Sequence, residues 1–588
     1  MSLELVTLEN FKEKLPSWNP SGRDGQVFAI VDMGSNGIRF SISDLSLPTT
    51  RLLKTVYKER ASISLYDDLN SSKTNPPTFS QETITAVSEV VHRLQKIAQE
   101  LYNVPAANFT IMATEAMRKA GNAASMIRAI GTTVYVLEPQ VETLFGAAMG
   151  SRSAFHKIDN GGLFFDLGGG SVQMSWIDTS KPGYEITAAQ TGKSLPFGAA
   201  RLRNILESND AEMRTTEIQT LQSGMALAFS ELCRQFSVLQ ETRDGKGIDL
   251  YMCGGGFRGY GSMLMHTDEI SPYPVPSIGN YTVSGDVFKQ TQRMLDLNTS
   301  YKGKIFNVSK RRRKQFPAIV TVVEAVIAAV GNIRTVTFCA GSNREGSLMM
   351  KLPQDIRESD PAKSLMYLNS RFYENQTDQE YSDFANAISK ILRSALPSNP
   401  SIDLSNTVFG LGLHNNMISH LWDNLGGEEE GNSTLALHHA TSESIDLPGL
   451  SHVGRAALAV TLVARWDGQL SPADEEILVS LKKILNRADP NAAFWHVYIG
   501  TMARIMVNIV PKRPETAEEI SRLSASVSFQ AKLKNESSPS DGFKVEITVE
   551  NAESHGLDYD EIREMIDNTR QEAHAQGFQE IETQFTVL

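Results

Sequence analysis

The sequence has little of several features that would place it in a common class of proteins. Only three cysteines occur among 588 residues, and their spacing fits neither a disulfide framework nor a zinc site. The net charge of -12 argues against the basic surface of a general nucleic-acid binder. The first ten residues include Glu4 and Glu9 and no apolar segment typical of a signal peptide. These absences predict a cytoplasmic protein with no nucleic-acid partner.

One apolar stretch has to be weighed as a membrane span. Residues 318–330 are strongly apolar and follow the basic run from Arg311 to Lys314, but Glu324 interrupts them. A transmembrane helix needs about 20 apolar residues. The stretch therefore predicts a buried helix, and no membrane partner is expected.

A repeated motif is the strongest positive signal. An apolar run that ends in Asp-x-Gly occurs at residues 28–34 and again at residues 163–168. Each copy continues into alternating apolar and polar residues, at 38–42 and at 172–176, as a second strand would. The sequence predicts two hairpins of similar plan. Because the motif is duplicated, a chance pair of unrelated turns is the weaker interpretation.

The composition of these turns suits a phosphate site. Glycines let backbone N–H groups approach a phosphate, and a small hydroxyl or amide adds donors. Asp32 and Asp166 end the first strand of each hairpin. A carboxylate there would repel a bare anion but can hold a divalent cation beside it. The turns predict a metal–phosphate site with Asp32 and Asp166 as metal ligands and Mg²⁺ as the cation.

Four further segments carry a resemblance to a known family. They are Ala-Thr-Glu-Ala-Met-Arg at 113–118, Leu-Pro-Phe-Gly-Ala-Ala-Arg-Leu at 195–202, Gly-Gly-Gly at 254–256 and Asn-Arg-Glu-Gly at 343–346. The two turns resemble the phosphate loops of the superfamily that contains actin, sugar kinases and heat-shock ATPases. The four segments resemble the exopolyphosphatase/pentaphosphate-phosphatase (Ppx/GppA) family, over about residues 24–350.

The resemblance implies an α/β fold with two actin-like ATPase (ribonuclease H-like) domains that face a cleft. We expect the first domain at 24–140 and the second at 141–350. An all-α domain is expected at 355–515, where it resembles the HD-like domain of long family members but lacks the metal-binding His-Asp dyad. A small C-terminal α/β module is expected at 520–588.

Periodicity supports the two C-terminal parts. Apolar residues at three- and four-residue spacing predict helices at 381–392, 454–466, 472–485 and 492–507. A strand, a helix and a strand are predicted at 543–549, 559–576 and 581–587. The acidic, glycine-rich stretch 426–433 predicts a mobile loop. Four histidines are interpreted as capping or surface residues rather than metal ligands, namely His414, His420, His438 and His439.

The resemblance also implies roles for individual residues. Glu142 lies where the family has the carboxylate thought to activate water, and Arg118 lies where it has a phosphate-binding arginine. These two are the candidate catalytic residues. The candidate phosphate- or nucleotide-binding residues are Asp32, Gly34, Ser35, Asn36, Arg39, Asp166, Gly168, Gly169, Gly170, Ser171, Gln173, Gly254, Gly255 and Gly256.

Three positions depart from the family pattern. Gln173 stands where active members have a glutamate, Gly37 where a serine is usual, and Phe257 where a threonine is common. A glutamine cannot take a proton, and it binds a hard cation less strongly than a carboxylate does. The departures resemble the fungal retrograde-regulation branch of the family, whose members signal between mitochondrion and nucleus through protein partners.

The sequence thus predicts a phosphate- or nucleotide-binding signalling regulator, with ATP, another nucleotide or polyphosphate as ligand and with protein partners. An active exopolyphosphatase or pentaphosphate phosphohydrolase is the alternative, although Gln173 predicts weak or absent hydrolysis. A filament-forming protein like actin shares the fold, but the appended C-terminal parts disfavour it. The C-terminal module is interpreted as a surface for a protein partner or for homodimerisation.

Overall fold

The chain folds into two compact units, each with most of its contacts within itself. The computed structural model describes residues 3–19, 26–153, 158, 161–369, 378–398, 404–442, 449–467, 469–535, 542–549, 559–575 and 581–587. Unit 1 comprises residues 1–268 and 277–359, and unit 2 comprises residues 269–276 and 360–588. The four-part division expected from the sequence is finer than this grouping and stays a prediction. Among the described residues, no helix is long and apolar enough to cross a membrane.

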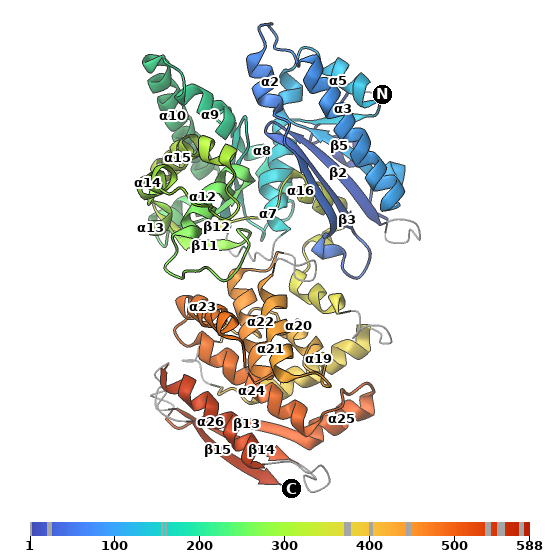
Figure 1. The fold of residues 1–588 in the computed structure, drawn as a ribbon, viewed down its shortest axis with the longest axis vertical. Helices are drawn as coiled ribbons and strands as arrows, with labels where there is room; N and C mark the ends of the chain where they lie inside the picture. The colour runs from blue at the N-terminus through green and yellow to red at the C-terminus, as the bar shows by residue number, and fades with distance from the viewer. Residues whose placement is uncertain are drawn as a thin grey trace. The chain divides into compact units, whose positions relative to one another are not determined.

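The first lobe of unit 1 is built on a six-stranded sheet. In spatial order its strands are β1 (Leu3–Val6), β6 (Val134–Leu137), β5 (Phe109–Ala113), β2 (Val27–Gly34), β3 (Gly37–Asp44) and β4 (Lys54–Ala61). β2, β3 and β4 form an antiparallel meander, and the remaining pairs are parallel. α3 (Gln81–Lys96) and α5 (Ala123–Ile130) pack together against one face (Figure 1).

The second lobe repeats this plan. In spatial order its strands are β11 (Tyr281–Ser284), β12 (Ile333–Phe338), β10 (Ile248–Cys253), β7 (Gly162–Leu167), β8 (Val172–Ile177) and β9 (Lys193–Leu195). The order β9-β8-β7-β10-β12 corresponds to β4-β3-β2-β5-β6, with the same meander and the same parallel pairs. The predicted hairpin repeat is therefore confirmed as the repeat of a whole ribonuclease H-like sheet.

Two segments of unit 1 refine the expectations. The apolar stretch 318–330 forms the buried C-terminal part of helix α15 (Lys310–Val330), as predicted. The glycine run 254–256 opens helix α12 (Gly254–His266) directly after β10. It therefore presents a helix N-terminus, with its partial positive charge, rather than a hairpin loop.

The N-terminal residues belong to the core of unit 1, although the sequence predicted the first domain only from residue 24, which lies outside the described residues. β1 pairs with β6, and Phe11 and Trp18 are buried in one hydrophobic cluster with Phe145 and Phe164. Phe11 meets Phe145 edge to face at a centroid distance of 6.0 Å. The segment therefore supports the helix that carries Glu142.

Unit 2 contains the predicted helices. They are α19 (Asp378–Ser394), α22 (His452–Arg465), α23 (Pro472–Ala488) and α24 (Ala492–Ile509). The mobile loop predicted at 426–433 was wrong in its second half, because α21 (Glu429–Thr441) begins there. Glu429 and Glu430 lie in its first turn, where carboxylates are favourable beside the helix N-terminus.

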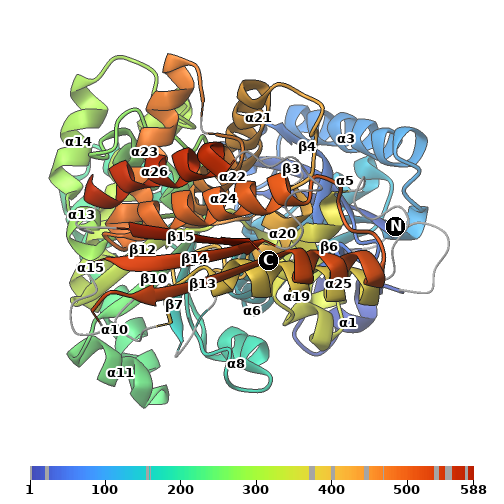
Figure 2. The same ribbon diagram turned by 90° about the horizontal axis from the view of Figure 1, so that it is seen from below.

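The C-terminal sheet has one more strand than the sequence analysis proposed. β14 (Phe543–Val549), α26 (Tyr559–Ala575) and β15 (Ile581–Val587) were predicted, whereas β13 (Val527–Leu533) was missed. β13 pairs with β14 antiparallel, and Figure 2 shows the three strands side by side. Phe543 packs on Trp495 and Tyr498 of α24, with ring centroids 5.6 and 5.3 Å apart.

Candidate phosphate-binding site

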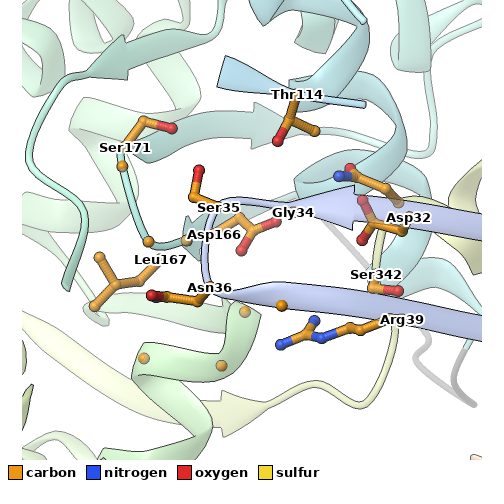
Figure 3. Close-up of a pocket in the computed structure, with 18 of the residues that line it drawn as sticks. Asp32, Gly34, Ser35, Asn36, Arg39, Thr114, Asp166, Leu167, Ser171 and Ser342 are labelled. Carbon is orange, nitrogen blue, oxygen red and sulfur yellow. The ribbon is translucent and has the colours of Figure 1, made fainter. Parts of the chain in front are cut away.

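A pocket of about 80 Å³ lies between the two lobes of unit 1. Residues of both hairpins surround it, including Asp32 and Asn36 from the first and Asp166 and Ser171 from the second (Figure 3). Every residue predicted to bind phosphate or nucleotide lines this pocket, and so does Glu142. Arg118 is not part of the lining and contacts Glu142 instead.

The second loop, residues 168–171, is held by a helix of its own lobe. The carbonyl oxygens of Gly168, Gly169 and Gly170 accept hydrogen bonds from N–H groups at the start of α9 (Ala199–Leu206) and from Gly198 before it. The C=O and N–H of a trans peptide point in opposite directions. The N–H groups of Gly169, Gly170 and Ser171 therefore point away from α9, on the side where an anion can accept them.

Gly198 explains the Leu-Pro-Phe-Gly segment. A Cβ atom on Gly198 would lie 2.3 Å from the Gly169 carbonyl carbon and 2.3 Å from the Gly170 nitrogen. No side chain fits that space, because both neighbours are backbone atoms that cannot rotate away. The glycine thus permits the close approach that fixes the second loop.

The first loop, residues 34–37, is held partly from the other lobe. Asn36 accepts hydrogen bonds from Arg311 of α15, at 3.2 Å through its backbone oxygen and 2.9 Å through Oδ1. The Ser35 oxygen accepts the N–H of Tyr66 at 3.0 Å. The position of this loop therefore depends on how the two lobes are closed.

The backbone conformation explains the glycine at position 37, one of the three departures from the family pattern. Its φ is +154°, and a Cβ atom there would lie 3.0 Å from the Ala61 oxygen of the neighbouring strand. A serine would be strained in this backbone. The glycine at this position therefore fits the turn and is not by itself a sign of lost chemistry.

The strand registers place different partners opposite the two aspartates. Asp32 pairs with Arg39 across β2 and β3, and Asp166 pairs with Gln173 across β7 and β8. Side chains of directly opposed residues share one face of the sheet. The first hairpin thus presents a carboxylate with a cation, and the second presents a carboxylate with a neutral amide.

Burial raises the pKa of both aspartates. The Arg39 guanidinium lowers the pKa of Asp32 in opposition to burial, and Arg258 and Arg39 do the same for Asp166. Asp32 Oδ1 is buried without a hydrogen-bond partner among the described atoms. Its unmet acceptor capacity suits a cation or an ordered water.

Glu142 ends the short helix α6 (Pro139–Glu142), which continues into the π-helical segment η4 (Thr143–Met149). Burial raises the pKa of Glu142 to about 7, although the adjacent Arg118 guanidinium, 3.1 Å from Oε2, favours its charged form. The carboxyl group can therefore gain or lose a proton near neutral pH, which general acid–base chemistry requires.

Arginines supply the positive charge of the pocket. Arg39, Arg60 and Arg312 line it. Burial and the neighbouring arginines lower the pKa of Arg39 to about 10 and that of Arg312 to about 9. Asp32 partly compensates the charge of Arg39, whereas the charged groups that act on Arg312 are all arginines, and Arg312 forms no ion pair within the described part of the chain. A bound polyanion would stabilise such an excess of positive charge at the pocket.

Gln173 is 2% exposed and bound to serines. Its Nε2 atom donates to Ser171 Oγ at 2.7 Å and lies 3.3 Å from Ser194 Oγ. The amide therefore holds the second loop through a hydrogen bond that a carboxylate could make only as an acceptor. A glutamine at this position preserves the shape of the loop while it removes a negative charge.

Several lining residues were missed by the sequence analysis. They are Arg60, Thr114, Arg312, Ser342 and Asn343. Thr114 and Asn343 lie in quoted family segments, so the segments themselves pointed to them. Arg312 lies in the basic run before the apolar stretch, which was considered only as the flank of a membrane span.

The two aspartates fit a magnesium site that a ligand completes. No three His, Cys, Asp or Glu side chains of the described residues form a group that could hold a metal ion. Mg²⁺ in phosphate sites takes one or two carboxylates and fills its shell with waters and phosphate oxygens. A Cβ atom on Gly146 would lie 2.5 Å from Asp166 Oδ2 and 2.9 Å from Asn343 Oδ1. These two hard oxygens therefore converge beside a residue without a side chain.

Comparison with known proteins decides the family. Residues 45–355 match the Ppx/GppA phosphatase family, and residues 374–577 match the RTG2 C-terminal domain. The chain belongs to the Ppx/GppA phosphatase family. This Ppx/GppA member is 31% identical over 503 residues to Retrograde regulation protein 2 of Saccharomyces cerevisiae, a comparison that covers 82% of this chain and 80% of the yeast protein.

Solved structures of Ppx/GppA proteins are more distant. An exopolyphosphatase from Cytophaga hutchinsonii is 19% identical, with a TM-score of 0.41, over 55% of this chain and 96% of that one. The Ppx/GppA phosphatase of Aquifex aeolicus is 18% identical, with a TM-score of 0.40, over 56% of this chain and 100% of that one. The actin-like assignment of this Ppx/GppA member rests on its own repeated sheet order.

Proposed function

We propose that this Ppx/GppA member is a regulator that binds a phosphate-terminated ligand in the pocket between its lobes and hydrolyses it weakly or not at all. The observation that carries the proposal is the neutral, buried Gln173 opposite Asp166 in a pocket that keeps its cationic residues. The ligand class is a nucleotide or polyphosphate. Both present the same terminal phosphates to the two loops.

Binding is supported by the donors that meet at the pocket. The N–H groups of the second loop, the N-terminus of α12, and Arg39 and Arg312 all favour negative charge. Asp32 and Asp166 would hold Mg²⁺, which would neutralise part of the charge of the phosphate groups. The chain itself positions the phosphates through both loops.

Weak hydrolysis is supported by the loss of a carboxylate. Transfer of a phosphoryl group to water needs a group that orients the water and cations that stabilise the charge of the transition state. Glu142 can serve as the base, but Gln173 offers neither a proton acceptor nor a charge for a cation. Ligand binding is expected to survive this change better than turnover.

A regulatory role follows if the ligand changes lobe closure, because closure changes the outer surfaces available to protein partners. The yeast relative bears the name of retrograde regulation. We propose the same role, in signalling from mitochondria to the nucleus, for this chain. The proposal includes a cytoplasmic location, protein signalling partners and dimerisation through the C-terminal module.

An active phosphohydrolase is the second candidate function, favoured by the Glu142 carboxyl with its pKa of about 7 beside Arg118. It would release terminal phosphate from polyphosphate or guanosine pentaphosphate. The two candidates share the ligand and differ in turnover.

The experiment measures binding and phosphate release for native protein and for Gln173→Glu. Calorimetry with Mg²⁺ and tripolyphosphate, ATP or GTP tests the ligand, and phosphate release tests turnover. We expect native binding without turnover, and a gain of turnover of about tenfold or more in Gln173→Glu. Gln81→Glu, which adds the same charge at an exposed position of α3, is the control. Absence of binding to all three ligands at millimolar concentration would refute the proposal.

A further inference from the structure

A carboxylate of the chain itself lies between two arginines beside the pocket. Asp67 is part of α2 (Leu65–Ser71) in the first lobe. Its Oδ1 lies 3.3 Å from Arg203 Nη2, and its Oδ2 lies 3.3 Å from Arg311 Nη2. Arg203 belongs to α9 and Arg311 to α15, both in the second lobe.

This cluster adjoins the first loop. Arg311 also donates to Asn36, which lines the pocket, and to Ser64 Oγ at 2.8 Å. One arginine therefore contacts both the pocket wall and Asp67. The cluster is partly exposed, since the side chains of Asp67, Arg203 and Arg311 are 38%, 19% and 28% accessible. An anion arriving from solvent can reach it.

The pocket, at about 80 Å³, is small beside a polyphosphate of tens of units. Most of a long polyphosphate chain therefore has to lie outside the pocket, and Arg311, which bonds to Asn36 of the pocket wall, connects the pocket to Asp67 and so to Arg203.

Two guanidinium groups around one carboxylate form an anion site, because the same donors bind a phosphate. We propose that Arg203 and Arg311 form a second phosphate subsite and that Asp67 occupies it. The proposal rests on the proposed phosphate binding in the main pocket. Asp67 thereby acts as a specificity residue, which favours ligands with short phosphate chains and opposes long ones.

The position of Asp67 also connects ligand length to the lobes. Its ion pairs join α2 of the first lobe to α9 and α15 of the second. A long chain that enters the subsite breaks these ion pairs, whereas a short ligand leaves them intact. Long and short phosphates would therefore stabilise lobe arrangements that differ at this edge.

The test compares two ligands on the full-length protein. Tripolyphosphate and a long polyphosphate of about 60 units are titrated with Mg²⁺ into native protein and Asp67→Asn. We expect Asp67→Asn to bind the long chain about five- to tenfold more tightly, because a competing charge is removed, and tripolyphosphate within about twofold of native. An equal change for both ligands, or weaker binding of the long chain, would overturn the proposal.

A second acidic partner of Arg203 provides a matched control. Glu207 also pairs with Arg203, at 3.6 Å, but is 62% exposed and does not contact Arg311. Glu207→Gln is expected to leave the ratio of the two affinities unchanged. A gain in this variant equal to that of Asp67→Asn would show a general charge effect and contradict the assignment of the subsite to Asp67.

A double variant separates loss of the subsite from misfolding, because tripolyphosphate binding reports on the folded main pocket. In Asp67→Asn with Arg203→Gln, the subsite loses one of its cations, and the gain in long-chain affinity should disappear while tripolyphosphate binding persists. Persistence of the gain would contradict the subsite. Failure of native protein to bind tripolyphosphate would refute the proposed function, whereas binding with an unchanged affinity ratio would refute only the subsite.

Discussion

The two hairpins at the pocket share one register and differ in what stands opposite the aspartate. In the first, Arg39 faces Asp32, and in the second, Gln173 faces Asp166. The first hairpin therefore presents a carboxylate beside a cation, and the second presents a carboxylate beside a neutral amide. The duplicated fold gives both loops the same register, and the two hairpins differ in the charge opposite the aspartate.

The hairpins also differ in how they are supported. The second loop is fixed by hydrogen bonds to α9 within its own lobe, whereas the first loop is held partly by Arg311 from the opposite lobe. A loop supported within one lobe is preorganised for a ligand whether the lobes are open or closed. A loop supported across the lobes can report on closure, which is what a regulator needs.

The largest expected effect on the second loop comes from a substitution at Gly198. Gly198→Ala would place a Cβ atom 2.3 Å from the backbone of the second loop. We expect loss of tripolyphosphate binding in calorimetry and a stability lower by about 2 kcal/mol in denaturant unfolding. Gly224→Ala is the control, because its Cβ would meet only the Leu195 side chain, at 3.3 Å. Unchanged binding in Gly198→Ala would contradict the role of the second loop.

The next largest effect is expected at Arg312, a cation of the pocket wall. Arg312→Gln removes a pocket guanidinium that has no ion pair within the described residues, and we expect tripolyphosphate affinity to fall by about 30-fold. Lys310→Gln, an exposed charge at the start of the same helix, is the control and should change the affinity less than about twofold. Equal effects of the two changes would mean that the pocket charge acts only at long range.

Arg311→Gln tests whether only the first loop is held from the opposite lobe. This arginine bonds to the first loop and, among the described residues, forms no hydrogen bond with the second. Hydrogen exchange should therefore rise at residues 34–37 and stay unchanged at residues 168–171. Tripolyphosphate affinity should fall by about fivefold. Faster exchange in both loops would show that the second loop also depends on closure.

The smallest expected effect is a dependence on pH. The pKa of Glu142 is raised to about 7 by burial, so this group becomes negative as pH rises through 7. The charge should oppose an anionic ligand, and affinity should fall by about threefold from pH 6 to pH 8 relative to Glu142→Gln. Because the ligand titrates equally in both proteins, the ratio of native affinity to Glu142→Gln affinity isolates the contribution of Glu142. A rise of this ratio with pH would contradict the loss of a proton from Glu142 near pH 7.

The hairpins and the long helices could be predicted because their signals are local. Alternation and the Asp-x-Gly ends located both hairpins, and helical spacing located α22, α23 and α24 within a few residues. No element was predicted at 527–533, although Val527 and Phe529 of β13 alternate with polar residues. The start of α21 was missed because glycine and acidic residues also suit loops.

The site could be predicted only where a motif repeats or resembles a family segment. The loops and aspartates follow from the duplicated pattern, and Glu142 from the family resemblance. Arg60 and Arg312 could not be assigned, because their place in the pocket depends on the packing of β4 and α15 against the loops. Gly37 is the opposite case, since only its φ of +154° shows that glycine serves the turn.

The most direct test of the central claim measures binding and turnover on one sample. Native protein with Mg²⁺ and tripolyphosphate should give a calorimetric binding isotherm and release phosphate no faster than buffer alone, and Gln173→Glu should release it faster. Rapid phosphate release by native protein, abolished in Glu142→Ala, would contradict the account and assign the chain to the active phosphohydrolases.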